Sequence, residues 1–159
     1  MVRFAKILIP VDAERESGPI LDHGIALARA FGSQVDLVHV FEREGYHGPW
    51  RLELDPQGAA QPAAEVSAWP AARSLAQLMA TVRDAGVARV RGLMAKGPAD
   101  EAVIELVRHE PYDLVVMGTH GYHGLSHMVL GSVAEKVVRG CPCPVLTVHV
   151  EFPRSTATR

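Results

Sequence analysis

Residues 114–132 read LVVMGTHGYHGLSHMVLGS, and this stretch decides the fold. The four apolar residues 114–117 are too few for a helix and predict a buried strand. Glycines follow at regular spacing at positions 118, 121 and 124, and they let a ligand approach the main chain without side-chain obstruction. Gly131-Ser132 then predicts the start of a helix over about residues 132–139. The unpaired N–H groups and the dipole of such a helix start favour an anion.

Short apolar runs alternate with amphipathic segments on both sides of this stretch. Four more strands are predicted, over residues 6–11, 35–40, 87–94 and 145–148. Helices are predicted after Ser17, ending at Gly32, around residues 75–82, and after Gly97-Pro98. Strands that alternate with helices imply right-handed crossovers and a mostly parallel, doubly wound sheet. The third predicted strand carries Arg89 and Arg91 between apolar neighbours, which is typical of an edge strand with one solvated side.

Residues 42–70 show no periodicity and contain several glycines and prolines. The segment is too long for an ordinary connection, so we expect a functional loop, an excursion over the surface or a partly disordered stretch. Trp50 and Trp69 argue against complete disorder, because indole rings usually pack on something.

Bulk composition favours one cytoplasmic domain over residues 1–150, with a tail at 151–159. The chain has 159 residues and a formal net charge of −2, which gives no basic field to recruit duplex nucleic acid. Its start does not resemble a signal peptide, and no apolar run is long enough to predict a membrane span. The two cysteines, Cys141 and Cys143, are unlike a secreted disulfide framework. They could be redox-active, but one intervening residue is not the C-x-x-C arrangement, so structural thiols at a strand entry are the favoured interpretation.

In doubly wound sheets, ligands bind beyond the carboxyl ends of the strands, where the winding direction reverses. No Walker A sequence is present, and no GxGxxG follows the first strand, so neither common nucleotide motif applies. The candidate ligand-binding residues are those that end the strands and those of the glycine-rich stretch. They are Pro10, Val11, Asp12, Val40, Met117, Gly118, Thr119, His120, Gly121, His123, Gly124, Gly131, Ser132 and Val133.

The spacing Gly118-x2-Gly121-x9-Gly131-Ser132 resembles the G-2x-G-9x-G(S/T) motif of the ATP-binding universal stress proteins. Further segments are similar to the opening strand, the second strand and the ending of that family. These are KILIPVD at 6–12, VDLVHV at 35–40, GSVAEKV at 131–137 and CPCPVL at 141–146. The resemblance spans the chain except residues 42–70.

The resemblance implies a five-stranded parallel sheet of order 3-2-1-4-5, Rossmann-like and similar to the adenine nucleotide alpha hydrolases. It also implies regulation in stress, redox or metabolic adaptation and a homodimer through the last strand, Val145, Leu146, Thr147 and Val148. The implied ligand is ATP, ADP or AMP, with Mg²⁺ as an accompanying ion. Asp12 would contact adenosine and Val40 would hold adenine through its main chain. Gly118, Gly121, Gly131, Ser132 and the amide of Val133 would hold ribose and phosphates.

This chain departs from the family at Tyr122, His123 and His127, where relatives often carry arginine or lysine. Imidazole, with an unperturbed pKa of about 6.5, is mostly uncharged at neutral pH, so less fixed positive charge faces the phosphates. A bound Mg²⁺ near Asp12 would offset this. We therefore expect nucleotide affinity to rise as the pH falls towards 6.

The same residues can also be interpreted without a nucleotide. Ser132 and Glu135 fit a capping box, so Ser132 could cap its own helix. Asp12 could serve as a turn residue, and the glycines could form only a tight turn. His120, His123 and His127 could bind zinc, although no cysteine or carboxylate lies at a suitable spacing.

Three functions remain open. The first is a nucleotide-sensing regulator with protein partners that the sequence does not identify, and the second is a slow ATP-hydrolysing enzyme on the same site. The third is a dimeric adaptor that has lost nucleotide binding. Ser126 and Ser132 have histidines nearby in sequence, but no orienting third group completes a nucleophile–base set. The sequence therefore predicts binding, with weak ATPase activity at most.

Overall fold

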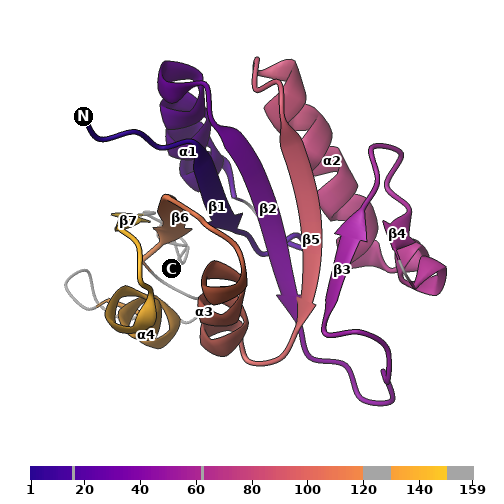
Figure 1. Cartoon of the computed structure of the whole chain (residues 1–159). Helices are drawn as coiled ribbons and strands as arrows, with labels where there is room; N and C mark the ends of the chain where they lie inside the picture. The colour runs from indigo at the N-terminus through magenta and orange to yellow at the C-terminus, as the bar shows by residue number, and fades with distance from the viewer. Residues whose placement is uncertain (16, 62, 120–129, 150–159) are drawn as a thin grey trace, which may run out of the picture.

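The computed structural model describes residues 1–15, 17–61, 63–119 and 130–149. They form one seven-stranded sheet of order β4-β3-β5-β2-β1-β6-β7 (Figure 1). Five of the strands run parallel to one another, and their bounds are Lys6–Pro10 (β1), Gln34–Phe41 (β2), Val90–Lys96 (β5), Leu114–Gly118 (β6) and Val145–Val148 (β7). Numbered among themselves, these five lie in the order 3-2-1-4-5, which confirms the predicted α/β class and the order of its parallel strands.

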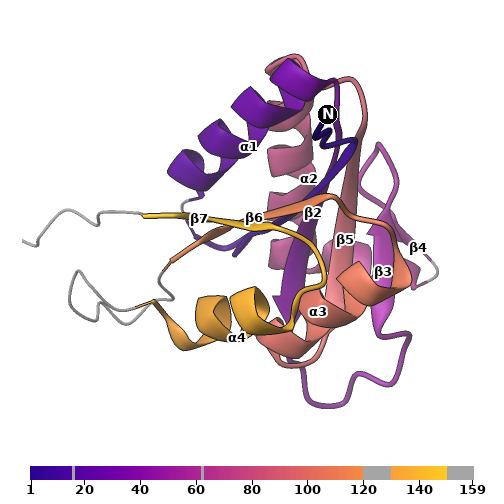
Figure 2. The same ribbon diagram turned by 60° about the vertical axis from the view of Figure 1, so that its left-hand side comes forward.

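Helices cover both faces of the sheet (Figures 1 and 2). The helices α1 (Gly18–Phe31) and α2 (Pro70–Asp84) lie on one face, and α3 (Ala99–His109) and α4 (Ser132–Gly140) lie on the other. Buried apolar side chains accordingly form two clusters, one under each helix pair. Ile7, Ile9, Val35 and Leu37 belong to the first cluster, and Leu8 on the opposite side of β1 belongs to the second. This alternation follows from the two-residue period of a strand.

The residues expected to begin and end α1 are confirmed. Ser17 is the N-cap residue, a proline occupies the first turn, and Gly32 ends the helix at φ 66°. A positive φ of this size favours glycine, because a Cβ would clash with the neighbouring carbonyl oxygen. The hydroxyl of Ser17 makes no capping hydrogen bond, so its side chain does not stabilise the helix start in the usual way.

Residues 42–70 are an excursion that extends the sheet. Within it lie β3 (Arg51–Leu54), β4 (Ala60–Gln61) and the 3₁₀ helix η1 (Ala64–Ala68). β3 pairs antiparallel with β5, and β4 pairs antiparallel with β3. The strand count is therefore seven where the sequence predicted five. The two extra strands are only four and two residues long, and they show no hydrophobic period long enough to be recognised.

The prediction that the third parallel strand lies at an edge is wrong. β5 lies between β2 and β3, so both of its sides are paired. Arg91 therefore does not lie on a solvated face. Its guanidinium donates to the buried carboxylate of Asp36 at 2.6 Å and to Glu110 at 2.6 Å. Arg91 belongs to a partly buried charge network around Asp36, whereas Arg89, two residues earlier, is exposed.

Within the ranges described above, no helix combines the length and apolar character needed to cross a bilayer. The tail expected at residues 151–159 lies outside the described residues.

Candidate functional site

The carboxyl ends of β2, β1 and β6 lie side by side at the point where the winding of the sheet reverses (Figure 1). From β1 the chain continues to β2 and β5 on one side of the sheet, and it later returns to β6 and β7 on the other. β1 pairs with β2 over five residues, from Lys6 to Pro10. Within the described strands, its ladder with β6 holds only Ile7–Leu114 and Leu8–Val115. The two strands stop pairing before either ends, which is where such sheets bind ligands.

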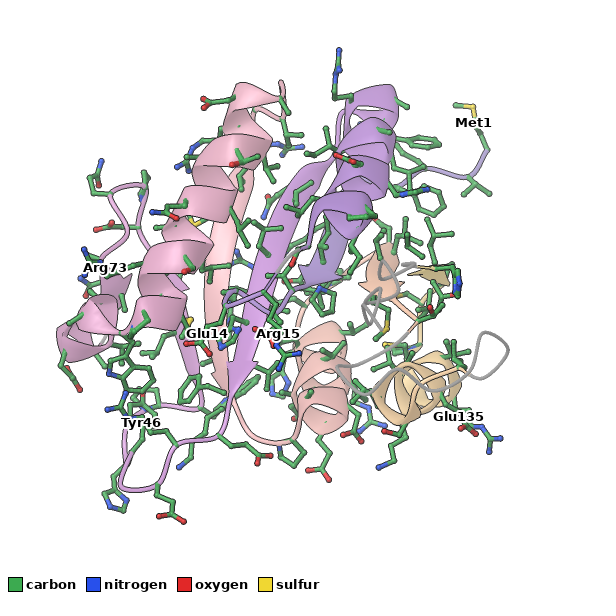
Figure 3. All side chains as sticks on the ribbon, turned by 180° about the vertical axis from the view of Figure 1, so that it is seen from behind. Met1, Glu14, Arg15, Tyr46, Arg73 and Glu135 are labelled. Carbon is green, nitrogen blue, oxygen red and sulfur yellow. The ribbon has the colours of Figure 1, made fainter. Side chains whose placement is uncertain are left out.

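Asp12 follows β1 at this edge and is half-buried. One of its carboxylate oxygens, Oδ1, accepts a hydrogen bond from the amide of Glu14 at 3.0 Å. This is the turn geometry that aspartate favours. The turn interpretation of Asp12 is therefore correct, and it leaves the second carboxylate oxygen available to a ligand. Figure 3 shows Glu14 and Arg15 beyond this turn, on the face covered by α1 and α2.

His39 fixes the same turn from the neighbouring strand. Its side chain is buried, and its Nδ1 accepts a hydrogen bond from the amide of Ala13 at 3.1 Å. Because Nδ1 is an acceptor, the proton of the neutral ring must be on Nε2. Sequence analysis did not identify this role. A histidine inside an otherwise apolar strand, two residues before its carboxyl end, is the signal that could have indicated it.

The main chain of Val40 faces the space that β1 leaves. Successive residues of β2 direct their main-chain groups to opposite neighbours, and the amide of Val11 donates to the carbonyl oxygen of Val38 at 2.9 Å. Val40 therefore also directs its amide and carbonyl towards the β1 side. β1 has ended at Pro10, and the next amide in a position to continue the ladder, that of Ala13, donates to His39 instead.

One hydrogen bond joins the two ends of the glycine-rich stretch. The amide of Gly131 donates to the carbonyl oxygen of Thr119 at 2.7 Å, and the amide of Thr119 donates to Val148 of β7 at 3.0 Å. Gly118 ends β6, and Met117 before it is buried. Gly118, Thr119 and the start of α4 are thus brought together although twelve or more positions separate them in sequence. His120, Gly121, His123 and Gly124 lie outside the described residues, and so does His127, the third histidine of the alternative zinc interpretation.

The start of α4 differs from the capping-box interpretation. Gly131 is the N-cap residue and Ser132 is the first helical residue, with no side-chain hydrogen bond capping the helix. Ser132 is exposed, and Val133 is half-buried. Ser132 cannot cap the helix from within its first turn, because an N-cap residue must precede the helical backbone. The N–H groups of this first turn therefore lack the side-chain acceptor that a capping box would supply.

Gly131 has φ −60° and ψ 156°, which any residue can adopt. The local backbone does not require a glycine here. Glycine is a favoured residue at the N-cap position, which Gly131 occupies. This separates Gly131 from Gly32, whose positive φ alone explains its identity.

An aromatic cluster borders the site at the carboxyl end of β2. Phe41, Tyr46 and Trp69 meet edge to face, with ring centroids 5.0 to 5.5 Å apart. The guanidinium of Arg43 lies 4.4 Å from the centroid of the Trp69 ring. Tyr46 and Trp69 lie near the two ends of the 42–70 excursion, so the cluster holds both ends of this segment against the sheet.

The part of the chain with assigned structure holds no cluster of three or more histidine, cysteine, aspartate or glutamate side chains suited to a metal ion. A carboxylate turn, an outward-facing main chain and an uncapped helix start can together bind a polar ligand that carries an anionic group.

Comparison with family models matches residues 3–149 to the universal stress protein family. A universal stress protein of Methanocaldococcus jannaschii is 30% identical over 145 residues, which cover 91% of this chain and 82% of that protein. A universal stress protein of Thermus aquaticus is 32% identical over 147 residues, which cover 92% and 99% of the two chains.

Two solved structures of similar fold have ligands named with them. One is a universal stress protein in complex with cAMP, with a TM-score of 0.67 and 18% identity, over 94% of this chain and 99% of that one. The other is a universal stress protein of Archaeoglobus fulgidus in complex with dAMP, with a TM-score of 0.61 and 17% identity, over 92% and 98%. At these identities the likeness is one of fold.

Proposed function

Because this chain belongs to the universal stress protein family, we propose that it binds an adenine nucleotide at the carboxyl edge of β1, β2 and β6 and acts as a nucleotide-sensing regulator. ATP is the nucleotide that the Gly118–Ser132 motif favours, with ADP or AMP as alternatives. The cAMP and dAMP complexes of the similar folds support an adenine nucleotide in general.

The hydrogen bond between Gly131 and Thr119 carries this proposal. It closes the glycine-rich stretch at the end of β6 and holds the N-terminus of α4 there. An anion at a helix N-terminus gains about 0.3–1 kcal/mol from the dipole alone, and hydrogen bonds to unpaired amides add to this. Phosphates would bind to Gly131, Ser132 and the amide of Val133.

The adenosine moiety would lie between the other two strand ends. The free carboxylate oxygen of Asp12 is suited to ribose hydroxyls, and the outward amide and carbonyl of Val40 are suited to the donor and acceptor edge of adenine. Mg²⁺ would neutralise part of the phosphate charge and supply electrostatic stabilisation, with Asp12 as the nearest carboxylate of the proposed site.

The sensing role requires that nucleotide binds one conformational or oligomeric state better than another, because a ligand without differential affinity shifts no equilibrium. The proposed homodimer through β7 is the candidate for such an equilibrium. Within the described residues, β7 has β6 on one side and no strand on the other (Figure 2). Leu146 of β7 is 37% exposed and Val138 of α4 is 45% exposed.

Two measurements test nucleotide binding directly. The protein is purified gently and denatured, and the released small molecules are identified by mass spectrometry. ATP with Mg²⁺ is titrated into nucleotide-free protein by calorimetry. A nucleotide in the first measurement or saturable binding in the second supports the proposal. Absence of both favours the adaptor, and steady release of ADP that Gly131→Ala abolishes favours the enzyme.

The Gly131→Ala variant is also a sharp test of binding. Its backbone conformation is open to alanine, so we expect a folded protein with only a small loss of stability from the poorer N-cap residue. ATP affinity should fall by about tenfold or more, because the added methyl group blocks phosphate approach. Wild-type affinity in a folded Gly131→Ala variant would contradict phosphate binding at this helix start.

Two variants test the proposed contact between Asp12 and the adenosine moiety. Asp12→Ala should weaken ATP binding by about 10-fold to 100-fold, the range for losing a hydrogen bond to a charged group. Glu14→Ala removes the same charge two residues later from an exposed side chain and should leave affinity unchanged. If the two variants bind ATP equally, Asp12 does not contact the ligand.

The contribution of His123 and His127 to ATP affinity can be measured from its dependence on pH. ATP affinity should be higher at pH 6 than at pH 8, because protonated His123 and His127 would face the phosphates. A double His123→Asn, His127→Asn variant should lose this difference. Flat or weaker binding of the wild type between pH 8 and pH 6 would contradict the idea.

A further inference from the structure

Thr119 is the residue at which three elements meet at the carboxyl edge of the sheet. It directly follows β6, and its amide donates to the carbonyl oxygen of Val148, the last residue of β7, at 3.0 Å. Its own carbonyl oxygen accepts the amide of Gly131, the N-cap residue of α4, at 2.7 Å. The main chain of Thr119 is therefore held from both sides, and the direction of its hydroxyl depends on the side chain alone.

The pairing of β6 with β7 sets the side of the sheet on which this hydroxyl lies. The amide of Val115 makes the equivalent bond to Pro144 earlier in the same pair of strands, so the strand geometry continues as far as Thr119. Successive side chains of a strand alternate between its two faces, so Thr119 shares the face of Met117. Met117 belongs to the apolar cluster beneath α3 and α4. The side chain of Thr119 is thus on the same face as α4, whose first turn is the proposed phosphate site (Figure 2).

His149 reaches the same hydroxyl from β7. It directly follows that strand, and its Nδ1 lies 3.4 Å from Oγ1 of Thr119, a residue thirty positions away in sequence. The strand register brings the two together, because Gly118 pairs with Val148 and the next residue of each strand lies beside that of the other. His149 is exposed and Thr119 is partly exposed, so the pair is open to a ligand from solvent.

A threonine hydroxyl can hold two partners in series, because it has one donor and two acceptor positions. The oxygens of an ionised phosphate are acceptors. A phosphate at the start of α4 therefore favours the arrangement in which Nδ1–H of His149 donates to Thr119 and the Thr119 hydroxyl donates to the phosphate. Because threonine is β-branched and has few χ1 rotamers, a contact on Oγ1 is enough to select the direction of the hydroxyl.

We propose that His149 is a positioning residue of the nucleotide site, which orients the Thr119 hydroxyl towards a phosphate bound at the start of α4. The inference rests on the proposed function and adds the end of β7 to the site. Motif spacing did not indicate His149, because this residue lies outside the glycine-rich stretch and meets Thr119 only through strand pairing.

A double-mutant cycle in the full chain tests whether His149 acts through Thr119. ATP with Mg²⁺ is titrated by calorimetry into the wild type, Thr119→Val, His149→Ala and the double variant. Each single change should weaken ATP binding about threefold to tenfold, the usual contribution of one hydrogen bond. The double variant should bind no more weakly than Thr119→Val, because His149 then has no hydroxyl to orient. His47→Ala, which removes an exposed histidine of the 42–70 excursion, should bind like the wild type.

The His149→Asn variant distinguishes positioning from packing. Its side-chain amide places an N–H group near the position of Nδ1, so this variant should recover most of the ATP affinity that His149→Ala loses. Thr119→Ser keeps the hydroxyl and should likewise bind ATP more tightly than Thr119→Val. Thermal unfolding verifies that the variants are folded, and the comparison of the two His149 variants does not depend on those of Thr119.

Each remaining outcome has a definite meaning. Additive losses in the double variant would overturn the positioning role and leave nucleotide binding intact. The role also fails if His149→Ala binds ATP like the wild type, or if His149→Asn binds as weakly as His149→Ala. A wild type that binds no ATP would overturn the proposed function and the role of His149 with it.

Discussion

At the scale of single residues, His39 links the core to the proposed ligand site. Its ring is buried among apolar side chains, and its Nδ1 accepts the amide of Ala13. The adjacent residue, Asp12, is the one proposed to contact adenosine. A buried amide without an acceptor costs about 1–3 kcal/mol, so the turn after β1 depends on this ring in its neutral form.

Two substitutions of His39 distinguish the hydrogen-bond acceptor Nδ1 from the volume that the ring fills. His39→Leu should lower the free energy of unfolding by about 1–3 kcal/mol and weaken ATP binding, because the Ala13 amide loses its partner and the Asp12 turn can shift. His39→Asn places a carbonyl oxygen near the position of Nδ1 and should restore much of the affinity. Urea denaturation and calorimetry measure the two effects.

The rescue by asparagine distinguishes positioning from packing. A merely structural histidine would be replaced about equally badly by both residues. The positioning role fails if His39→Asn loses as much affinity as His39→Leu, or if His39→Leu binds ATP like the wild type.

At the scale of elements, a charge network joins β1, β2, β3, β5 and the residues that follow α3, on the face covered by α3 and α4. Asp36 of β2 is fully buried and accepts hydrogen bonds from Arg91 of β5 and from the hydroxyl of Tyr112, both at 2.6 Å. Glu110, which follows α3, accepts from Arg91 and from Lys6 of β1 and forms an ion pair with Arg51 of β3. The network ties the 42–70 excursion and the end of α3 to the central strands.

Removing Arg91 leaves the Asp36 carboxylate buried without its main partner. Arg91→Met should therefore lower the free energy of unfolding by about 3–5 kcal/mol. Arg89→Met is the matched control. Arg89 precedes Arg91 by two residues but is exposed, so this change should stay within about 0.5 kcal/mol. Urea denaturation of both variants measures the difference, and similar losses would show that the buried pair is not the determining feature.

Glu110 makes the network sensitive to acid. Burial alone would raise its pKa, but the hydrogen bonds from Lys6 and Arg91 and the nearby charge of Arg51 outweigh burial and hold the pKa below its ordinary value. A carboxyl with a lowered pKa in the folded state contributes stability that is present above the unfolded pKa. This contribution disappears as the pH falls through the folded pKa, because the unfolded chain then binds more protons.

We therefore expect the free energy of unfolding to decline with acidification below about pH 4.5, the region of an unperturbed glutamate. Glu110→Gln should decline less steeply and should already be less stable at pH 7. Glu101→Gln, which changes an exposed carboxylate in the first turn of α3, serves as the control. Chemical denaturation at a series of pH values measures the slopes, and equal slopes for wild type and Glu110→Gln would contradict this role.

At the scale of the whole molecule, the two edges of the sheet differ in whether additional short strands cover the parallel strands. The excursion covers β5 with β3 and β4, two short strands that protect the edge from pairing with other chains. β7 at the opposite edge has no such cover among the described residues (Figures 1 and 2). An uncovered apolar edge strand favours pairing with a second copy of the chain.

Leu146→Lys should weaken the proposed homodimer, because it places a charge on the exposed side of β7. Trp50→Lys is the control at the other end of the sheet, since Trp50 precedes β3 and is 38% exposed, close to the 37% of Leu146. Sedimentation velocity over a range of protein concentrations measures the monomer–dimer equilibrium. A monomeric wild type, or equal dimerisation of both variants, would contradict a dimer through β7.

The α/β class and the candidate edge of the sheet could be predicted from local information: apolar runs, the proline and glycine at the ends of α1, and the position of the glycine-rich stretch after β6. The order of the parallel strands was implied by the resemblance to the universal stress protein family. Asp12, Val40 and Gly131 could be proposed because they lie at the ends of elements that the sequence already delimits.

Only the tertiary structure decided which distant residues meet. Three features depend on packing: the acceptor role of His39, the pairing of Arg91 with the buried Asp36, and the two added strands of the excursion. A local pattern of arginines between apolar residues is the same for a solvated edge and for a buried ion pair. The register of neighbouring strands, which brings Asp36 beside Arg91, distinguishes the two.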